Sequence, residues 1–246
     1  MIINEFASLE EINQAVAELF VRAARSAIRD HGQFTLALTG GSSPEGLYRI
    51  LAREPFLSQV DWQHVFIFWG DERWVPIHDS HSNARMAFET LLDHVPIPRE
   101  QIFPMWAAGK EPEQFASEYE NQLKKILGPK GAFDLILLGM GEDAHTASLF
   151  PETEVLEEKT AWVKAYYLEP QQMNRITLTV PLINRAKEIV FLVYGKNKAS
   201  ALHVVLEGER NYQQYPAQLI APSEGKIGWY VDRAAASKLN HRNRDN

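Results

Sequence analysis

The pattern of apolar and polar positions predicts several helices along the chain. An amphipathic helix is expected over residues 8–30, because apolar side chains recur there at steps of three and four. Ser8 and Glu11 have the spacing of a capping box at its start, and Gly32 suits its end. Helical patterns also follow Pro44 and cover residues 82–92, 113–127 and 198–206, with a last helix after residue 231.

Short apolar runs between these helices predict strands. Three runs are apolar almost throughout and lead directly into glycine-containing loops, at residues 34–39, 65–69 and 133–138. Further strands are expected at residues 161–167, 175–180, 188–194 and 227–231. Apolar strands that alternate with helices are typical of a parallel sheet covered on both faces. We therefore predict an α/β fold with three layers, in which a mainly parallel, Rossmann-like sheet has helices on both faces. A single domain is expected over residues 1–246.

Composition narrows the class of protein. Hydrophobic residues make up 45% of the 246 residues and charged residues 23%, which is a normal globular balance. The longest apolar runs, residues 65–69 and 189–194, are far shorter than the roughly 18 residues of a membrane-spanning helix. The first residues lack the basic and apolar segments of a signal peptide. We expect a cytoplasmic protein without a membrane partner.

The absence of cysteine and the acidic balance exclude further classes. With no cysteine, disulfides, thiolate nucleophiles, cysteine-bound zinc and iron–sulfur clusters are ruled out. The formal net charge of −7 argues against a nucleic-acid partner. The short basic stretch at residues 241–244 is interpreted as a solvated tail.

Three predicted strands end in polar or glycine-rich sequences, at residues 40–43, 70–73 and 139–145. Ligands of open α/β sheets bind outside the carboxyl ends of the strands. Packing of the core gives no reason to place Asp, Glu, Arg and His at these ends. The coincidence predicts a functional site there.

The first of these loops, Gly40-Gly41-Ser42-Ser43, favours an anion site. It offers backbone N–H groups, hydroxyls and a helix start, with Ser43 as the expected N-cap and Pro44 as the first helical residue. It is not a Walker A loop, since no Gly-Lys-Ser/Thr follows. The alternative is a tight turn that ends in an ordinary serine cap.

The third loop matches the dinucleotide pattern G-x-G-x-x-A through Gly139, Gly141 and Ala144. The context does not fit, because Pro151 leaves no room for a normal helix after the loop. The acidic residue nearest the end of the next strand, Glu169, comes too late and precedes Pro170. Nicotinamide or flavin binding is therefore disfavoured.

His145 is the candidate acid–base group. It follows Asp143 by two residues in the third loop, and the ordinary pKa of histidine, about 6.5, suits proton transfer at neutral pH. The alternative is a loop histidine that bonds to the backbone. His78 and His81 lack a third metal ligand and are interpreted as part of a solvated loop. Arg175 and Lys198 fall near strand ends, where each is either an anion ligand or a surface charge.

Taken together, these segments resemble the 6-phosphogluconolactonases, within the glucosamine-6-phosphate deaminase-like superfamily. The matching pieces appear in the family's order and span about residues 34–202. They are residues 38–44, 69–76 with Ser82-Asn83, 139–151, 175–179 and 195–199. One departure is Ala144, where the family typically has glycine. If this position needs a positive φ, alanine is strained there.

The resemblance implies hydrolysis of 6-phosphogluconolactone to 6-phosphogluconate, the second step of the oxidative pentose phosphate route, without a cofactor. It implies that His145 is the catalytic base, which activates water and then protonates the departing ring oxygen. Asp143 would orient His145 or the substrate hydroxyls. Charge on the carbonyl oxygen would be stabilised either by backbone N–H groups of a glycine-rich loop or by Arg73.

The resemblance also implies a binding mode for the sugar phosphate. The phosphate would meet residues 40–43, with Arg175 and Lys198 as counter-charges. Asp71 is expected to bind substrate as well, and no metal is expected. A monomer and a homodimer are both compatible with the sequence.

Two other functions are weighed against this one. Glucosamine-6-phosphate deaminases usually carry Asp-Glu-Tyr where this chain has Asp71-Glu72-Arg73. They also continue the histidine loop toward Phe-Asn-Glu, whereas residues 148–151 here are Ser-Leu-Phe-Pro. The third hypothesis is a non-catalytic sugar-phosphate sensor, although the sequence shows no appended DNA-binding segment.

Overall fold

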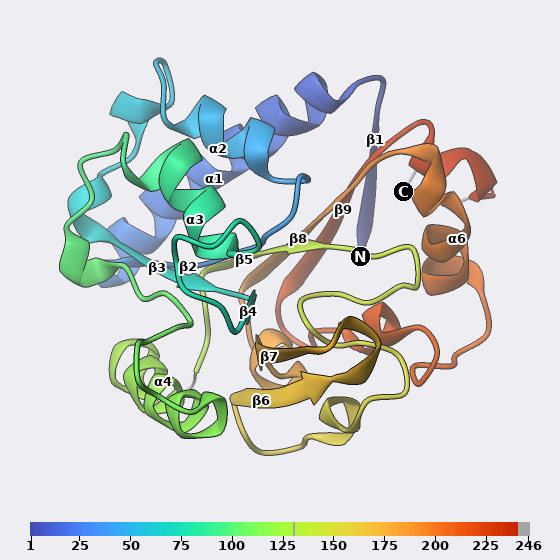
Figure 1. Ribbon diagram of the computed structural model, residues 1–246. Coiled ribbons are helices and arrows are strands. Elements are labelled where there is room, and N and C mark those ends of the chain that lie inside the picture. The colour runs from blue at the N-terminus through green and yellow to red at the C-terminus, as the bar shows by residue number, and fades with distance from the viewer. Residues whose placement is uncertain (130, 241–246) are drawn as a thin grey trace.

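A six-stranded parallel sheet forms the centre of the molecule (Figure 1). The computed structural model describes residues 1–129 and 131–240, so the basic stretch at residues 241–244 lies outside the described residues. The strands lie in the order β1, β9, β8, β5, β2, β3, and every neighbouring pair is parallel. Their bounds are β1 Ile2–Phe6, β2 Phe34–Leu38, β3 Val65–Trp69, β5 Leu135–Gly139, β8 Glu188–Val193 and β9 Lys226–Asp232.

The inner strands are buried on both faces, as their continuous apolar sequences require. Every residue of β2 is buried, and in β5 and β8 only one terminal residue is partly exposed. Side chains from both faces join one apolar core with the surrounding helices. The predicted α/β class with a mainly parallel sheet is confirmed.

Helices cover the sheet, and all but the short helix Val180–Ile183 lie where the pattern predicts them. The helices are α1 Leu9–His31, α2 Glu45–Leu51, α3 Asn83–Ala87, α4 Pro112–Leu127, α5 Val180–Ile183 and α6 Ala199–Glu207. Figure 1 shows α1, α2 and α3 gathered above the sheet, α4 below it and α6 beyond β9 on the right. The caps of α1 are as expected, since the Ser8 hydroxyl accepts from the Glu11 N–H and Gly32 is left-handed. None of these described helices is long and apolar enough to cross a membrane.

A second, antiparallel sheet lies below the first, and the sequence pattern did not predict it. Its order is β4 (Asp71–Arg73), β7 (Met173–Leu178), β6 (Val163–Leu168). Figure 1 shows β6 and β7 at the bottom of the molecule, beside α4. The polar stretch after β3 was expected to be a loop. Its pairing with β7, about a hundred residues away in the chain, makes it a strand.

Four smaller expectations are corrected as well. The first strand, β1, was not predicted, because an edge strand with partly exposed residues lacks a clear apolar run. Helix α2 begins at Glu45 and its cap position is Pro44, so Ser43 is not the N-cap. Helix 82–92 is α only to Ala87 and then continues as a π turn. The last helix is a short 3-10 turn, Ala235–Lys238.

The strand order places a cleft at one point of the sheet. From β2 the chain moves outward to β3, whereas from β5 it moves the other way to β8 and then β9. The connections therefore diverge above the neighbouring strands β2 and β5. Such a switch point leaves an open crevice at the carboxyl ends of the strands, where ligands bind in folds of this kind.

Candidate active site

A cleft of about 250 Å³ opens at this switch point. Its walls come from the loops after β2, β5 and β8, from β4 of the second sheet, and from the turn between β6 and β7. The lining includes nine of the ten residues singled out from the sequence: Gly40, Gly41, Ser42, Ser43, Asp71, Arg73, His145, Arg175 and Lys198. The tenth, Asp143, bonds to His145.

The loop after β5 is folded tightly enough to present His145 to the cleft. The Gly141 N–H donates to the His145 carbonyl at 2.8 Å, and the Thr146 hydroxyl donates to the Gly139 carbonyl at 2.8 Å. Ala144 at the tip has a φ of 63°, so the position that typically carries glycine in the family does need a left-handed backbone. Its methyl group is fully buried, and the strain expected there is present.

The His145 ring is held on its edge and on its face. Its Nδ1 lies 2.5 Å from Asp143 Oδ1, and its ring stacks on Phe150 with centroids 4.0 Å apart. Burial raises the pKa of Asp143, but hydrogen bonds from the ring and backbone of His145 outweigh this and hold that pKa below its ordinary value. An ionised Asp143 fixes a proton on Nδ1, which leaves Nε2 as the basic nitrogen.

Asp71 and Glu72 on β4 are buried carboxyl groups with separate roles. Ser148 in the histidine loop donates to Asp71 Oδ2 at 2.6 Å, so this carboxylate ties the loop to the second sheet. Glu72 instead accepts from the backbone N–H groups of Asn83 and Ala84 at the start of α3, each at 2.8 Å. Burial raises the pKa of Glu72 to about 7 against these hydrogen bonds. Glu72 does not line the cleft.

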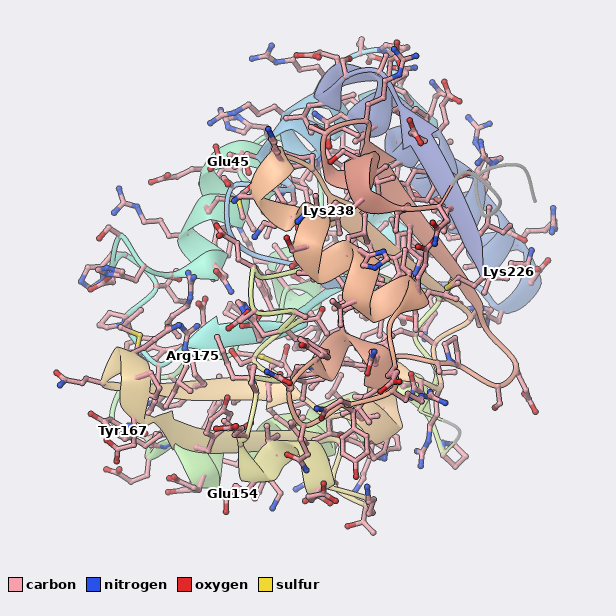
Figure 2. The ribbon with its side chains drawn as sticks, turned by 90° about the vertical axis from the view of Figure 1, so that its right-hand side faces the viewer. Glu45, Glu154, Tyr167, Arg175, Lys226 and Lys238 are labelled. Carbon is pink, nitrogen blue, oxygen red and sulfur yellow. The ribbon has the colours of Figure 1, made fainter. Side chains whose placement is uncertain are left out.

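Two arginines face each other across the antiparallel pair, Arg73 on β4 and Arg175 on β7. Arg175 is 4% exposed and its Nε has no hydrogen-bond partner, although Nη2 donates to Gln171. Its guanidinium lies over the Phe150 ring, 5.5 Å from the centroid. Burial lowers the pKa of Arg175, which the nearby Asp71 carboxylate opposes. Arg175 is therefore no surface charge, and Figure 2 shows it between β4 and the lower strands.

The remaining walls come from the ends of β2 and β8. The Tyr194 hydroxyl donates to the Ser42 carbonyl at 2.9 Å, and the Asn197 amide donates to Glu142 at 2.7 Å. These bonds hold the segment that carries Lys198 against both glycine-rich loops. Lys198 is partly exposed at the cleft and forms no ion pair with any residue that the structure describes.

The cleft also contains residues that the sequence reading did not select. Phe150 and Asn83 were noted within matching segments but given no role, and Gln171 carried no local signal. Their place in the cleft depends on contacts between distant segments. His78 and His81 lie exposed outside the cleft, as expected, and His81 bonds to Asp79 at 2.9 Å. Within residues 1–129 and 131–240, no group of three or more acidic or histidine side chains could hold a metal ion.

Fold and cleft define an open α/β protein whose switch-point crevice combines a histidine–carboxylate pair with cationic side chains. A family model described as glucosamine-6-phosphate isomerases/6-phosphogluconolactonase matches residues 7–229. The chain therefore belongs to this family.

Individual relatives agree with that assignment. A 6-phosphogluconolactonase from Synechocystis is 44% identical over 217 residues, which cover 87% of this chain and 88% of that protein. One from Haemophilus influenzae is 38% identical over 204 residues, which cover 83% of this chain and 87% of that protein. The solved 6-phosphogluconolactonase of Trypanosoma brucei matches with a TM-score of 0.84 at 26% identity, over 97% and 98% of the chains. A monomeric glucosamine-6-phosphate deaminase, at 24% identity and a TM-score of 0.82, shows the shared fold alone.

Proposed function

We propose that the chain is a 6-phosphogluconolactonase, which hydrolyses 6-phospho-D-glucono-1,5-lactone to 6-phospho-D-gluconate in the pentose phosphate pathway. The observation that carries the proposal is the cleft itself. It brings the His145–Asp143 pair and the buried cation of Arg175 to one site, in a chain 44% identical to a curated enzyme of that name.

In this reaction His145 acts as the general base. Its Nε2 takes a proton from water while the water oxygen bonds to C1 of the lactone. The tetrahedral intermediate then breaks the bond between C1 and the ring oxygen, and the imidazolium returns the proton to that oxygen. Asp143 keeps Nδ1 protonated and stabilises the transient imidazolium. Phe150 keeps one face of the ring away from water.

Arg73 is the group we assign to the developing charge on the carbonyl oxygen. Its Nη1 is occupied by the His81 carbonyl and Asn83 Oδ1, each at 2.9 Å. Its other N–H groups have no partner in the described part of the chain, so they can donate to a ligand in the cleft. A cationic donor fixed in advance stabilises an oxyanion without reorganisation during the reaction.

The phosphate is assigned to the other cations and to the loop after β2. Arg175 has an unused Nε donor in a buried position, which costs free energy unless a ligand accepts from it. Lys198 and the backbone of residues 40–43 complete an anion site of the kind that phosphates occupy. Asp71 is left to bind a sugar hydroxyl through the oxygen not used by Ser148.

The test is to incubate the purified protein with freshly made 6-phosphogluconolactone and, separately, with glucosamine 6-phosphate. We expect hydrolysis of the lactone well above its spontaneous rate and no release of ammonia. Ammonia from glucosamine 6-phosphate would indicate the deaminase instead. Binding of 6-phosphogluconate without turnover of either compound would indicate a sensor.

A further inference from the structure

Asn83 is the first residue of α3, and its backbone position is fixed from β4. Its N–H donates to Glu72 Oε1 at 2.8 Å, while the next N–H, of Ala84, donates to Glu72 Oε2 at 2.8 Å. The Asn83 side chain is 3% exposed and lines the cleft. One carboxylate therefore sets where the Asn83 amide enters the site.

Both polar atoms of the Asn83 amide form hydrogen bonds. Its Oδ1 accepts from Arg73 Nη1 at 2.9 Å, and its Nδ2 donates to the Asp71 carbonyl at 3.0 Å. The second bond fixes which way the amide faces, so its oxygen is always turned to the guanidinium. The Arg73 guanidinium donates to this oxygen and to the His81 carbonyl alone among the described partners.

The same amide touches the loop after β2. A Cβ built on Gly40 would lie 1.9 Å from Asn83 Oδ1, so only glycine allows this approach. Asn83 therefore lies between two parts of the cleft, the Gly40 loop of the large sheet and Arg73 on the small sheet. It sets the spacing between them.

We propose that Asn83 is a positioning residue for the lactonase reaction, since its amide holds the Arg73 guanidinium at a fixed distance from the Gly40 loop. The inference rests on the proposed function. The inference goes beyond the proposed function because it assigns the alignment of Arg73 to a residue outside the His145–Asp143 pair. A displacement of about 1 Å in such a group is enough to cost up to a hundredfold in rate.

The first test is a double-mutant cycle of Asn83→Ala and Arg73→Ala, measured as kcat and KM on the lactone. We expect Asn83→Ala to lower kcat about ten- to a hundredfold in the parent with little change in KM. In the Arg73→Ala background, Asn83→Ala should lower kcat by less than about threefold, because the guanidinium that Asn83 holds is already absent.

Ser82→Ala is the matched control, which tests whether a destabilised start of α3 is enough to lower kcat. It removes the Ser82 bonds to Glu72 and to the Arg85 N–H without touching Arg73. We expect it to lower the thermal midpoint as Asn83→Ala does, but to leave kcat within about threefold of the parent, since no cleft contact changes.

A second readout does not depend on turnover. Gly40→Ala should lower the thermal midpoint by several degrees in the parent, and by less than half as much in the Asn83→Ala background, where the clash is absent. Equal shifts in both backgrounds would show that the two residues do not touch.

The outcomes separate the two proposals. A parent that does not accelerate lactone hydrolysis overturns the proposed function, and with it the role of Asn83. An active parent in which Asn83→Ala costs the same factor with and without Arg73 overturns only the positioning role. So does a Ser82→Ala variant that loses as much kcat as Asn83→Ala.

Discussion

At the residue scale, the imidazole of His145 is fixed before any substrate arrives. Asp143 holds one nitrogen at 2.5 Å and Phe150 covers one face. The remaining nitrogen is left free to accept a proton, and His145, whose side chain is 29% exposed, lines the cleft. This arrangement makes the role of the residue directly testable.

His145→Gln should fold normally and lose roughly 10²–10⁴ in kcat, the range expected for one acid–base group. Glutamine keeps some of the size and hydrogen bonding but cannot take the proton. The measurement is initial lactone hydrolysis with the spontaneous rate subtracted at each pH. A variant within about threefold of the parent would place the base elsewhere, with Asp71 as the next candidate.

Arg175→Ala tests the phosphate assignment. A charge-assisted contact is worth roughly 1.5–3 kcal/mol, so kcat/KM on the phosphorylated lactone should fall by about one to two orders of magnitude. On unphosphorylated gluconolactone the loss should be much smaller. If both substrates suffer equally, Arg175 supports the cleft in another way than by binding phosphate.

At the scale of elements, the turn after β5 depends on the space beside Gly141. A Cβ at this position would lie 2.1 Å from His145 Nδ1 and 2.4 Å from Asp143 Oδ1. The bond between these two side chains can form only because position 141 carries no side chain. The loop and its acid–base pair are therefore one unit.

Gly141→Ala should accordingly lower kcat by at least tenfold, because the inserted methyl group separates the ring from its carboxylate. The control is Glu142→Ala, an exposed neighbour in the same turn whose loss removes only the bond from Asn197. Its kcat should stay within about threefold of the parent, since the segment that this bond holds carries Lys198, which acts on phosphate binding and therefore on KM. If Glu142→Ala lowers kcat as much as Gly141→Ala does, any substitution in this turn impairs the enzyme, and the loss in Gly141→Ala does not report on the bond between His145 and Asp143.

At the scale of the whole molecule, buried Glu72 joins the small sheet to the start of α3 and gives stability a pH dependence. Burial raises its pKa to about 7, above the ordinary value of 4.5. A carboxyl group with a raised folded-state pKa stabilises the fold fully below its unfolded pKa. That contribution is lost as the pH rises through the folded value.

Glu72→Gln removes this titration. The unfolding free energy of the parent minus that of the variant should fall between about pH 4.5 and 7, by up to about 3 kcal/mol. Urea unfolding at several pH values measures it, and the difference cancels the other titrating groups. If this difference instead rises with pH, the folded protein prefers the ionised carboxylate.

The sequence by itself determined five of the six strands of the large sheet, most helices and the edge of the sheet at which the candidate site lies. The apolar runs that form β2, β3 and β5 are local signals, and so are the glycine-rich and charged residues directly after them. Parallel strands bring their carboxyl ends to one edge, so residues 40–43, Arg73 and His145 were expected together. The contact between Asp143 and His145 could be expected because they are only two residues apart.

Tertiary structure alone decided the rest. Strand β4 is short and polar, and it exists because β7 pairs with it across about a hundred residues. The same pairing buries Arg175 opposite Arg73, and folding brings Phe150 between Arg175 and His145. Gln171 and Asn83 likewise join the cleft through side chains that meet only after the two sheets have packed. A local sequence pattern cannot predict such contacts, because their free energy comes from partners far apart in the chain.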